Sequence, residues 1–118
     1  MQALILYGIS NCSTVKKARD WLESQRIIYE FHDFKKHGAS QQLFENWLAQ
    51  MPLDKLINRT GLTWHGLDDA TKTSIIDNAT AIALMQAKTS VIKRPILEKN
   101  GKIVCLGFNE AAYKDCFK

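Results

Sequence analysis

The stretch YGISNCSTVKKARDWL, residues 7–22, contains the change from a strand pattern to a helix pattern on which the fold depends. The short apolar run before it, residues 3–7, ends at Gly8 and is typical of a buried strand. From Thr14 onwards apolar side chains recur at helical spacing, at Val15, Ala18, Trp21 and Leu22. The sequence therefore predicts a strand, a polar loop carrying Cys12, and a helix that begins just after this cysteine.

The rest of the chain extends this start into an α/β fold. Residues 27–34 are rich in β-branched and aromatic side chains and predict a second strand, parallel to the first in a right-handed βαβ unit. Two later apolar runs flank Asn100 and Gly101, a pair that is typical of a hairpin turn because both residues tolerate positive φ. Residues 109–116 then predict a last helix. The order β-α-β then β-β-α predicts a thioredoxin-like fold.

A helical insertion separates the two halves, over about residues 40–88. Ser40 is a suitable N-cap for its first helix, whose apolar side chains are Leu43, Phe44, Trp47, Leu48 and Met51. A short helix after Pro52 comes next, and residues 68–76 and 79–87 predict two more. Because no repeat, linker or low-complexity tract interrupts the pattern, we expect one domain over residues 1–118.

The composition narrows the class of protein. A chain of 118 residues can bury an apolar core, and its net charge of +4 is too mild for a nucleic-acid-binding surface. The opening MQALILY is too brief for a signal peptide, and no apolar run reaches the length of a membrane span. The three cysteines are scattered and form no CxxC pair, which argues against a metal site or a disulfide framework. We therefore expect a cytoplasmic monomer without a metal ion, bound neither to nucleic acid nor to a membrane.

Cys12 is the strongest candidate for chemistry. The first amides of a helix lack internal partners and carry partial positive charge, so a thiolate there is stabilised and its pKa falls from about 8.5. The hydroxyls of Ser13 and Thr14 can add donors, and Lys16 and Lys17 add positive charge. The alternative is a buried cysteine that serves only as a small apolar residue. The polar neighbours of Cys12 favour the reactive interpretation.

The remaining candidates have weaker sequence signals. Cys105 lies inside a strand pattern and is expected to be core packing, while Cys116 on the last helix is expected to be passive, although an exposed thiol there could resolve a disulfide. Pro95 suits the start of a strand, where no ladder donor is needed. Arg94 could clamp a carboxylate or oxyanion through two hydrogen bonds, or could be a solvated surface residue. Arg59 could simply complement a helix dipole.

Taken together, these motifs resemble the arsenate reductase (ArsC) and Spx family of thioredoxin-like proteins, and within it the YffB-like branch of small bacterial proteins. The resemblance covers nearly the whole chain and rests on the joint pattern YGISNCSTVKKARDWL, FHDFKKHG, LINRTG, SVIKRPIL and VCLGFNEAAY. It implies a thioredoxin fold with a helical insertion and makes Cys12 the catalytic cysteine. Arg59 and Arg94 match two arginines that arsenate reductases use to hold the oxyanion, and Pro95 matches the family's cis-proline.

Departures from the family pattern narrow the expected activity. Arsenate reductases carry a loop like HNPxCGTS, where this chain has Gly8, Ile9 and Ser10 in place of His, Asn and Pro. Their third arginine falls on Gly107, which counts against arsenate as the substrate. The second thiol of the Spx CxxC is replaced by Val15, so a CxxC redox switch is excluded.

The resemblance and the residues together predict a glutathione-dependent thiol–disulfide oxidoreductase that acts through Cys12. Glutathione, the expected co-substrate, would supply the resolving thiol that the chain lacks next to Cys12. Its binding residues, or those of an oxidised thiol or oxyanion substrate, are expected to be Asn11, Ser13, Thr14, Arg59, Arg94 and Pro95. Two alternatives stay open: an arsenate reductase coupled to glutathione and glutaredoxin, and a non-catalytic Spx-like module that docks on another protein.

Overall fold

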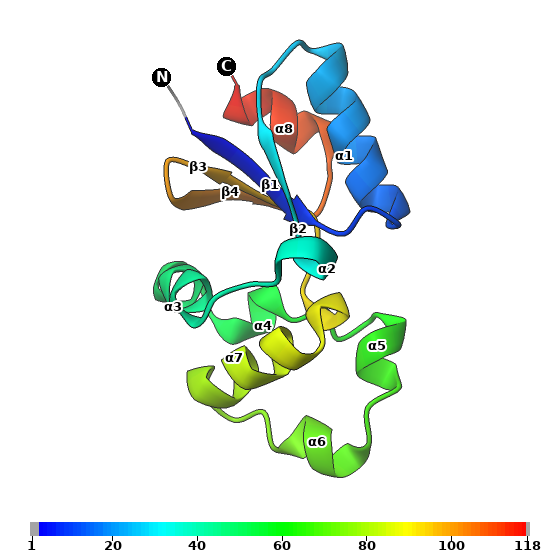
Figure 1. The fold of residues 1–118 in the computed structure, drawn as a ribbon, viewed down its shortest axis with the longest axis vertical. Coiled ribbons are helices and arrows are strands. Elements are labelled where there is room, and N and C mark those ends of the chain that lie inside the picture. Colours follow the sequence, from blue (N-terminus) through cyan, green and yellow to red (C-terminus); the bar gives the residue numbers. More distant parts are fainter. Residues whose placement is uncertain (1–2, 118) are drawn as a thin grey trace. The chain divides into compact units, whose positions relative to one another are not determined.

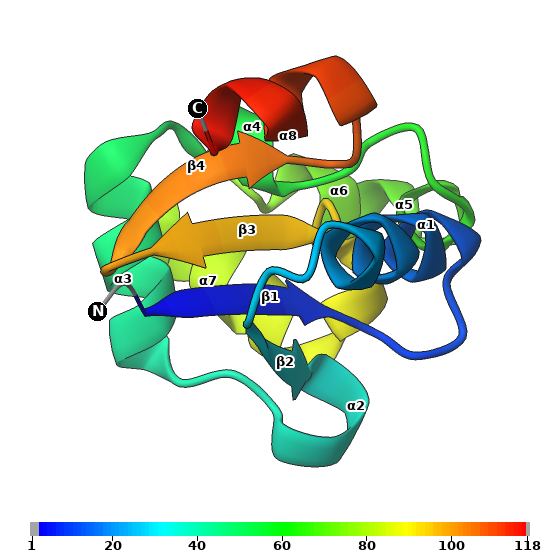
Figure 2. The same ribbon diagram turned by 90° about the horizontal axis from the view of Figure 1, so that it is seen from above.

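The computed structural model describes residues 3–117 and contains a four-stranded sheet with the strand order β2-β1-β3-β4 (Figure 2). The strands are β1 (Leu4–Gly8), β2 (Glu30–Asp33), β3 (Ile96–Lys99) and β4 (Lys102–Leu106). Strands β1 and β2 run parallel, whereas β3 is antiparallel to both β1 and β4. The predicted β-α-β and β-β-α halves are thus confirmed, and they share one sheet.

Two helices, α1 (Ser13–Ser24) and α8 (Glu110–Cys116), pack on one face of this sheet (Figure 1). The core between them consists of Leu4, Leu6, Ala18, Leu22, Leu97 and Tyr113. The Trp21 ring of α1 packs edge-on against the Tyr113 ring of α8, with 5.6 Å between the ring centroids. Burying a large apolar side chain stabilises a fold by about 1.5–3 kcal/mol, so this core holds α1 firmly against β1.

The turn between β3 and β4 has the conformation that its sequence predicts. Asn100 has φ 53° and Gly101 has φ 83°, the left-handed values that a two-residue hairpin turn requires. The Asn100 side-chain oxygen also accepts a hydrogen bond from the Ala3 N–H at 2.8 Å. This bond fixes the turn to the start of β1.

The chain divides into two compact units, residues 3–37 with 94–117 and residues 38–93, and the second unit is the predicted helical insertion. Its helices are α3 (Gln41–Gln50), α4 (Leu53–Leu56), α5 (Leu62–His65), α6 (Asp69–Thr73), α7 (Asn78–Ala87) and the 3-10 turn η1 (Thr89–Val91). The Ser40 hydroxyl accepts a hydrogen bond from the Leu43 N–H at 3.1 Å, which confirms the predicted N-cap of α3. Asp77 and Thr80 form a capping box at the start of α7.

The insertion has its own core and its own closing hydrogen bonds. Phe44, Trp47, Leu56, Trp64, Met85 and Ile92 are among its buried side chains. The Asn58 N–H donates to the Val91 carbonyl and the Lys93 N–H donates to the Leu56 carbonyl, both at 2.7 Å. These two bonds flank an isolated antiparallel bridge between Ile57 and Ile92. The end of α4 is thereby fastened to the segment that leads back towards β3.

Several predicted boundaries were wrong. The strand expected over residues 27–34 is only Glu30–Asp33, and Phe34–His37 instead form a short helix, α2. The Asp33 carboxylate accepts a hydrogen bond from the Lys35 N–H at 2.8 Å, which turns the chain out of the strand. The helix expected over residues 68–76 is shorter, because Asp68 serves as its N-cap and the helix ends at Thr73. Helix α5 was not predicted.

No helix within residues 3–117 combines the length and the apolar character that crossing a membrane requires.

Candidate functional site

Cys12 lies where β1 ends and α1 begins, as the sequence predicts. Its backbone is extended, with φ −104° and ψ 126°, and its carbonyl accepts the first helical hydrogen bond from the Lys16 N–H at 3.0 Å. It is therefore the N-cap residue of a 12-residue helix. The thiol is half-buried. Such a position leaves the sulfur accessible while the amides of the first helical turn face it.

The environment lowers the pKa of the Cys12 thiol. Partial burial by itself raises this pKa, but hydrogen bonds from the Val15 N–H, the Arg94 guanidinium and the Thr14 N–H, together with the charge of Arg94, outweigh burial. Donors and a positive charge beside the sulfur stabilise the anionic form of the thiol. The predicted thiolate site is thus built mainly by two backbone amides and one cation.

Arg94 reaches this sulfur because of the sheet register. Strands β1 and β3 are antiparallel, and Tyr7 lies opposite Ile96. The end of β1 and the start of β3 are therefore adjacent, at the same end of the sheet. Arg94 and Pro95 immediately precede β3, and the peptide bond between them is cis, as the family resemblance implies. The Pro95 carbonyl accepts a hydrogen bond from the Gly107 N–H at 2.8 Å.

The other residues expected around Cys12 border the same loop. Asn11 and Ser13 are exposed and Thr14 is half-buried. The backbone N–H groups of Thr14 and Val15 are the first-turn amides that the sequence predicts beside the thiol. Lys16 is held in a 2.7 Å ion pair with Asp20, which offsets its charge. Only the position of the helix start signalled these amides, since any residue can supply an N–H.

Arg59 belongs to the insertion and makes its contacts within it. It follows α4, and its guanidinium forms a 2.7 Å ion pair with the Asp54 carboxylate. The same guanidinium lies over the Trp64 ring, 5.2 Å from the ring centroid. About half of the Arg59 side chain, 46%, remains exposed. Its predicted participation in anion binding stays a prediction.

Comparison with known proteins identifies the family, because the family model named "ArsC family" matches residues 7–116. The chain belongs to the ArsC family. Its sequence is 37% identical over 114 residues to a protein of Haemophilus influenzae, covering 97% of this chain and 98% of that protein. Among solved structures, the YffB protein is 40% identical with a TM-score of 0.90 and covers 98% of this chain and 100% of its own.

A further relative connects this ArsC-family chain with reductases. An arsenate reductase (ArsC)-related protein from Brucella melitensis is 42% identical, with a TM-score of 0.77, covering 98% of this chain and 95% of that one. The thioredoxin-like fold and the resemblance to the YffB-like branch are confirmed. At the level of the family, these findings support thiol-based reductase chemistry.

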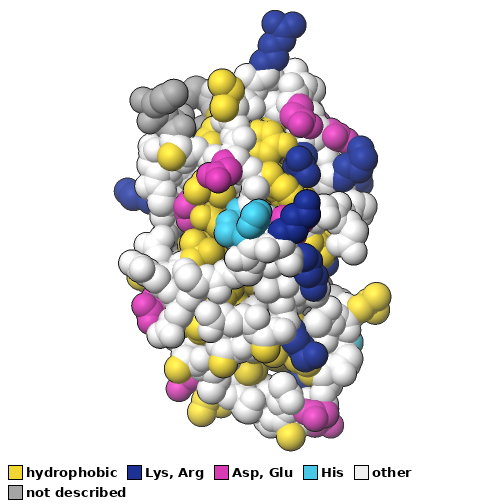
Figure 3. All heavy atoms as spheres, viewed as in Figure 1, with side chains coloured by type: hydrophobic (Ala, Val, Ile, Leu, Met, Phe, Trp, Pro, Cys, Tyr) yellow, Lys and Arg dark blue, Asp and Glu magenta, His cyan; other side chains and the backbone are white. Residues whose placement is uncertain are grey.

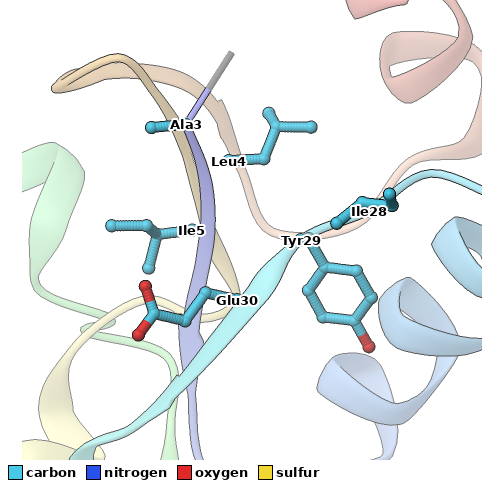
Figure 4. A pocket seen from close by; sticks show the side chains of 6 residues that line it. All are labelled: Ala3, Leu4, Ile5, Ile28, Tyr29 and Glu30. Atoms are coloured by element: carbon cyan, nitrogen blue, oxygen red, sulfur yellow. The ribbon is translucent and has the colours of Figure 1, made fainter. Parts of the chain in front are cut away.

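One surface hollow of the ArsC-family chain lies away from this cysteine. It has a volume of about 290 Å³ and is lined by Ala3, Leu4, Ile5, Ile28, Tyr29 and Glu30 (Figure 4). These residues come from the beginning of β1 and from the segment that leads into β2, whereas Cys12 follows the end of β1. Its lining is mostly apolar and contains no cysteine.

Charges of both signs occur together on the surface of this ArsC-family protein. On the face drawn in Figure 3, Lys and Arg side chains lie next to Asp and Glu side chains. Among residues 3–117, no group of three His, Cys, Asp or Glu side chains is placed to hold a metal ion.

Proposed function

We propose that this ArsC-family protein is a glutathione-dependent thiol–disulfide oxidoreductase in which Cys12 is the nucleophile, working as a cytoplasmic monomer without a metal ion. The observation that carries the proposal is the lowered pKa of Cys12, held down by first-turn amides and by Arg94. A lowered pKa increases the fraction of this thiol that is present as the reactive thiolate at a given pH. Membership of the ArsC family supports reductase chemistry at this cysteine.

The reaction consists of two thiol–disulfide exchanges. The Cys12 thiolate attacks the glutathione sulfur of a mixed disulfide, the substrate sulfur leaves as a thiolate and takes a proton, and Cys12 becomes joined to glutathione. A second glutathione, as its thiolate, then attacks the sulfur of the bound glutathione. Oxidised glutathione leaves and the Cys12 thiolate is regenerated. In sum, the mixed disulfide and one glutathione thiol are converted into the substrate thiol and oxidised glutathione.

An external resolving thiol fits the residues around Cys12. The position three residues after Cys12 holds Val15, a fully buried aliphatic side chain, so no adjacent thiol can close a CxxC disulfide. Glutathione carries two carboxylates, which suit the forked guanidinium of Arg94. We assign its further contacts to Asn11, Ser13, Thr14, to Arg59 as a second clamp, and to Pro95 as a docking edge.

A turnover assay tests the proposal. The purified protein is supplied with the mixed disulfide of glutathione and 2-mercaptoethanol, and formation of oxidised glutathione is followed with glutathione reductase and NADPH. We expect turnover with wild type and none with C12S, while C105S, which changes a different cysteine, keeps the activity. Undiminished turnover by a folded C12S variant contradicts the assignment of Cys12.

Arsenate reduction is the second candidate, because the related Brucella melitensis protein is described as arsenate reductase-related. One observation opposes it in this chain. Gly107, at the place of the family's third arginine, has φ 74°, a conformation that side-chain-bearing residues rarely adopt. A second assay, in which arsenate, glutathione and glutaredoxin replace the mixed disulfide, distinguishes the two activities. We expect arsenate to be the poorer substrate. If neither substrate turns over and Cys12 reacts like an ordinary thiol, non-catalytic docking replaces both.

A further inference from the structure

The other two cysteines contact each other. Cys105 lies in β4, Cys116 is the last residue of α8, and their Sγ atoms are 3.1 Å apart. Both thiols are half-buried, and Cys105 packs against the core cluster beneath α1 and α8. The prediction that Cys105 packs in the core therefore agrees with its position, but its contact with Cys116 was not predicted.

The two sulfurs have little distance to close before they could bond. A disulfide has an S–S length of about 2.05 Å, so the sulfurs would approach by about 1 Å. Cys116 occupies the last position of α8, where the helix ends and the backbone is held by fewer helical bonds. Local adjustment there can bring the sulfurs together while β4 keeps its place in the sheet.

The Cys105 thiol stays protonated over the physiological range. Burial, followed by its hydrogen bond and charge interaction with Cys116, raises the pKa of Cys105 to about 12. A protonated thiol does not initiate exchange, since the thiolate is the attacking species. The first attack on an oxidant therefore falls to Cys116, and Cys105 serves as the neighbouring thiol that follows.

We propose that Cys105 and Cys116 form a second, reversible thiol–disulfide site that ties the end of α8 to β4 and operates independently of Cys12. The oxidant is a low-molecular-weight disulfide such as oxidised glutathione. The Cys116 thiolate attacks it, forms a mixed disulfide and releases one glutathione thiolate. Cys105 then loses its proton, attacks the Cys116 sulfur and displaces the second glutathione, which takes up that proton. The pair loses two electrons and two protons, and oxidised glutathione becomes two glutathione molecules.

The position of the pair in the fold gives the bond a consequence. Strand β4 is at the edge of the sheet, and α8 is a short helix near the end of the chain. Short terminal helices open easily, because few contacts hold them. A covalent bond between α8 and β4 would keep the helix packed against the sheet, together with its Tyr113 side chain, which is fully buried. Oxidation should therefore stabilise this unit, and reduction should release it.

The experiment uses the full-length C12S variant, so that the active-site thiol does not contribute. The protein is equilibrated with increasing ratios of oxidised to reduced glutathione, free thiols are blocked with iodoacetamide, and the product is digested with trypsin without reduction. Cleavage after Lys102 and Lys114 places Cys105 and Cys116 on different peptides, residues 103–114 and 115–118. We expect these peptides to be joined, with a loss of two hydrogens, and to separate again on treatment with reduced glutathione.

Two matched variants complete the test. C12S/C105A should accumulate a stable glutathione adduct on Cys116, because no second thiol can displace it, and C12S/C116A should react slowly at Cys105. Oxidised C12S should also melt higher than reduced C12S by roughly 5 °C or more. A C12S protein that carries only glutathione adducts or free thiols at high oxidant overturns the proposed bond. A joined peptide with an unchanged or lower melting temperature overturns its stabilising role.

Discussion

Val15 Cγ2 lies 2.7 Å from the point where a Cβ atom on Gly8 would stand, and Val15 Cγ1 lies 3.2 Å from it. Real Cβ atoms essentially never approach another heavy atom within 3.0 Å. The Val15 side chain of α1 thus fills the space beside Gly8, which has no side chain, at the end of β1. Gly8 and Val15 are also two of the positions where the chain departs from the arsenate reductase loop and the Spx CxxC. These two departures are therefore sterically coupled.

Filling this space should destabilise the protein. In G8A the new methyl group would collide with Val15, and we expect the free energy of unfolding to fall by about 1–3 kcal/mol. V15A alone should cost about 2 kcal/mol, because it leaves a cavity. The double variant should cost less than the two changes added together, since each relieves the other. Urea unfolding of all four proteins measures this coupling, and strictly additive losses would contradict it.

Cys12 and Cys105 should alkylate in a fixed order as the pH is raised. First-turn amides and Arg94 lower the pKa of Cys12, whereas burial raises that of Cys105 to about 12. Iodoacetamide should therefore modify Cys12 with a pH midpoint below that of a free thiol, and leave Cys105 unmodified until strongly alkaline pH. Peptide mass spectrometry after timed labelling gives both profiles. Equal midpoints for these two cysteines would remove the basis for a special role of Cys12.

Arg94 should influence both the pKa of Cys12 and the binding of glutathione. In R94Q a hydrogen bond and a positive charge beside the sulfur are lost while its burial remains, so the pKa of Cys12 should rise. The KM for the glutathione mixed disulfide should rise as well. Compared with R94Q, R94K should recover part of the lowering of the Cys12 pKa. It should recover less of the binding of glutathione, because an ammonium lacks the planar fork of a guanidinium. K93Q, at the exposed neighbouring position, makes the same change in charge and should alter neither quantity.

Installing the family's third arginine should not produce an arsenate reductase. Gly107 has φ 74°, and a side-chain-bearing residue there costs about 1–2 kcal/mol. We expect G107R and G107A to lose similar stability, since the strain arises in the backbone. Arsenate turnover by G107R should not exceed that of wild type. A stable G107R variant with increased arsenate turnover would show that the glycine, and not the rest of the site, determines the substrate.

Strong local signals allowed much of the fold to be predicted. The change of period after Gly8 located β1 and α1 correctly, and the Asn100–Gly101 pair located the hairpin, because these features depend on residues close in sequence. Helix α5 was missed because it comprises only Leu62–His65 between two glycines, less than the length over which periodicity can be recognised. Helix α2 was missed because the apolar Phe34 continues the pattern of the preceding strand.

The candidate site was predictable only in part. The position of Cys12 before a helix and the role of the first-turn amides could be predicted from the sequence, whereas the added hydroxyl donors of Ser13 and Thr14 stay a prediction. The contact between Cys105 and Cys116 could not be predicted from the sequence, because it depends on how α8 packs against β4. Long-range contacts of this kind leave no local pattern in the chain.

Because backbone amides of α1 supply much of the stabilisation of the Cys12 thiolate, the side chains around it are left free to diversify. Mutation of a neighbouring residue can reshape the substrate-facing surface without removing these donors, provided that the helix still starts at Ser13. Relatives could thus acquire new substrates during evolution while inheriting the same reactive sulfur.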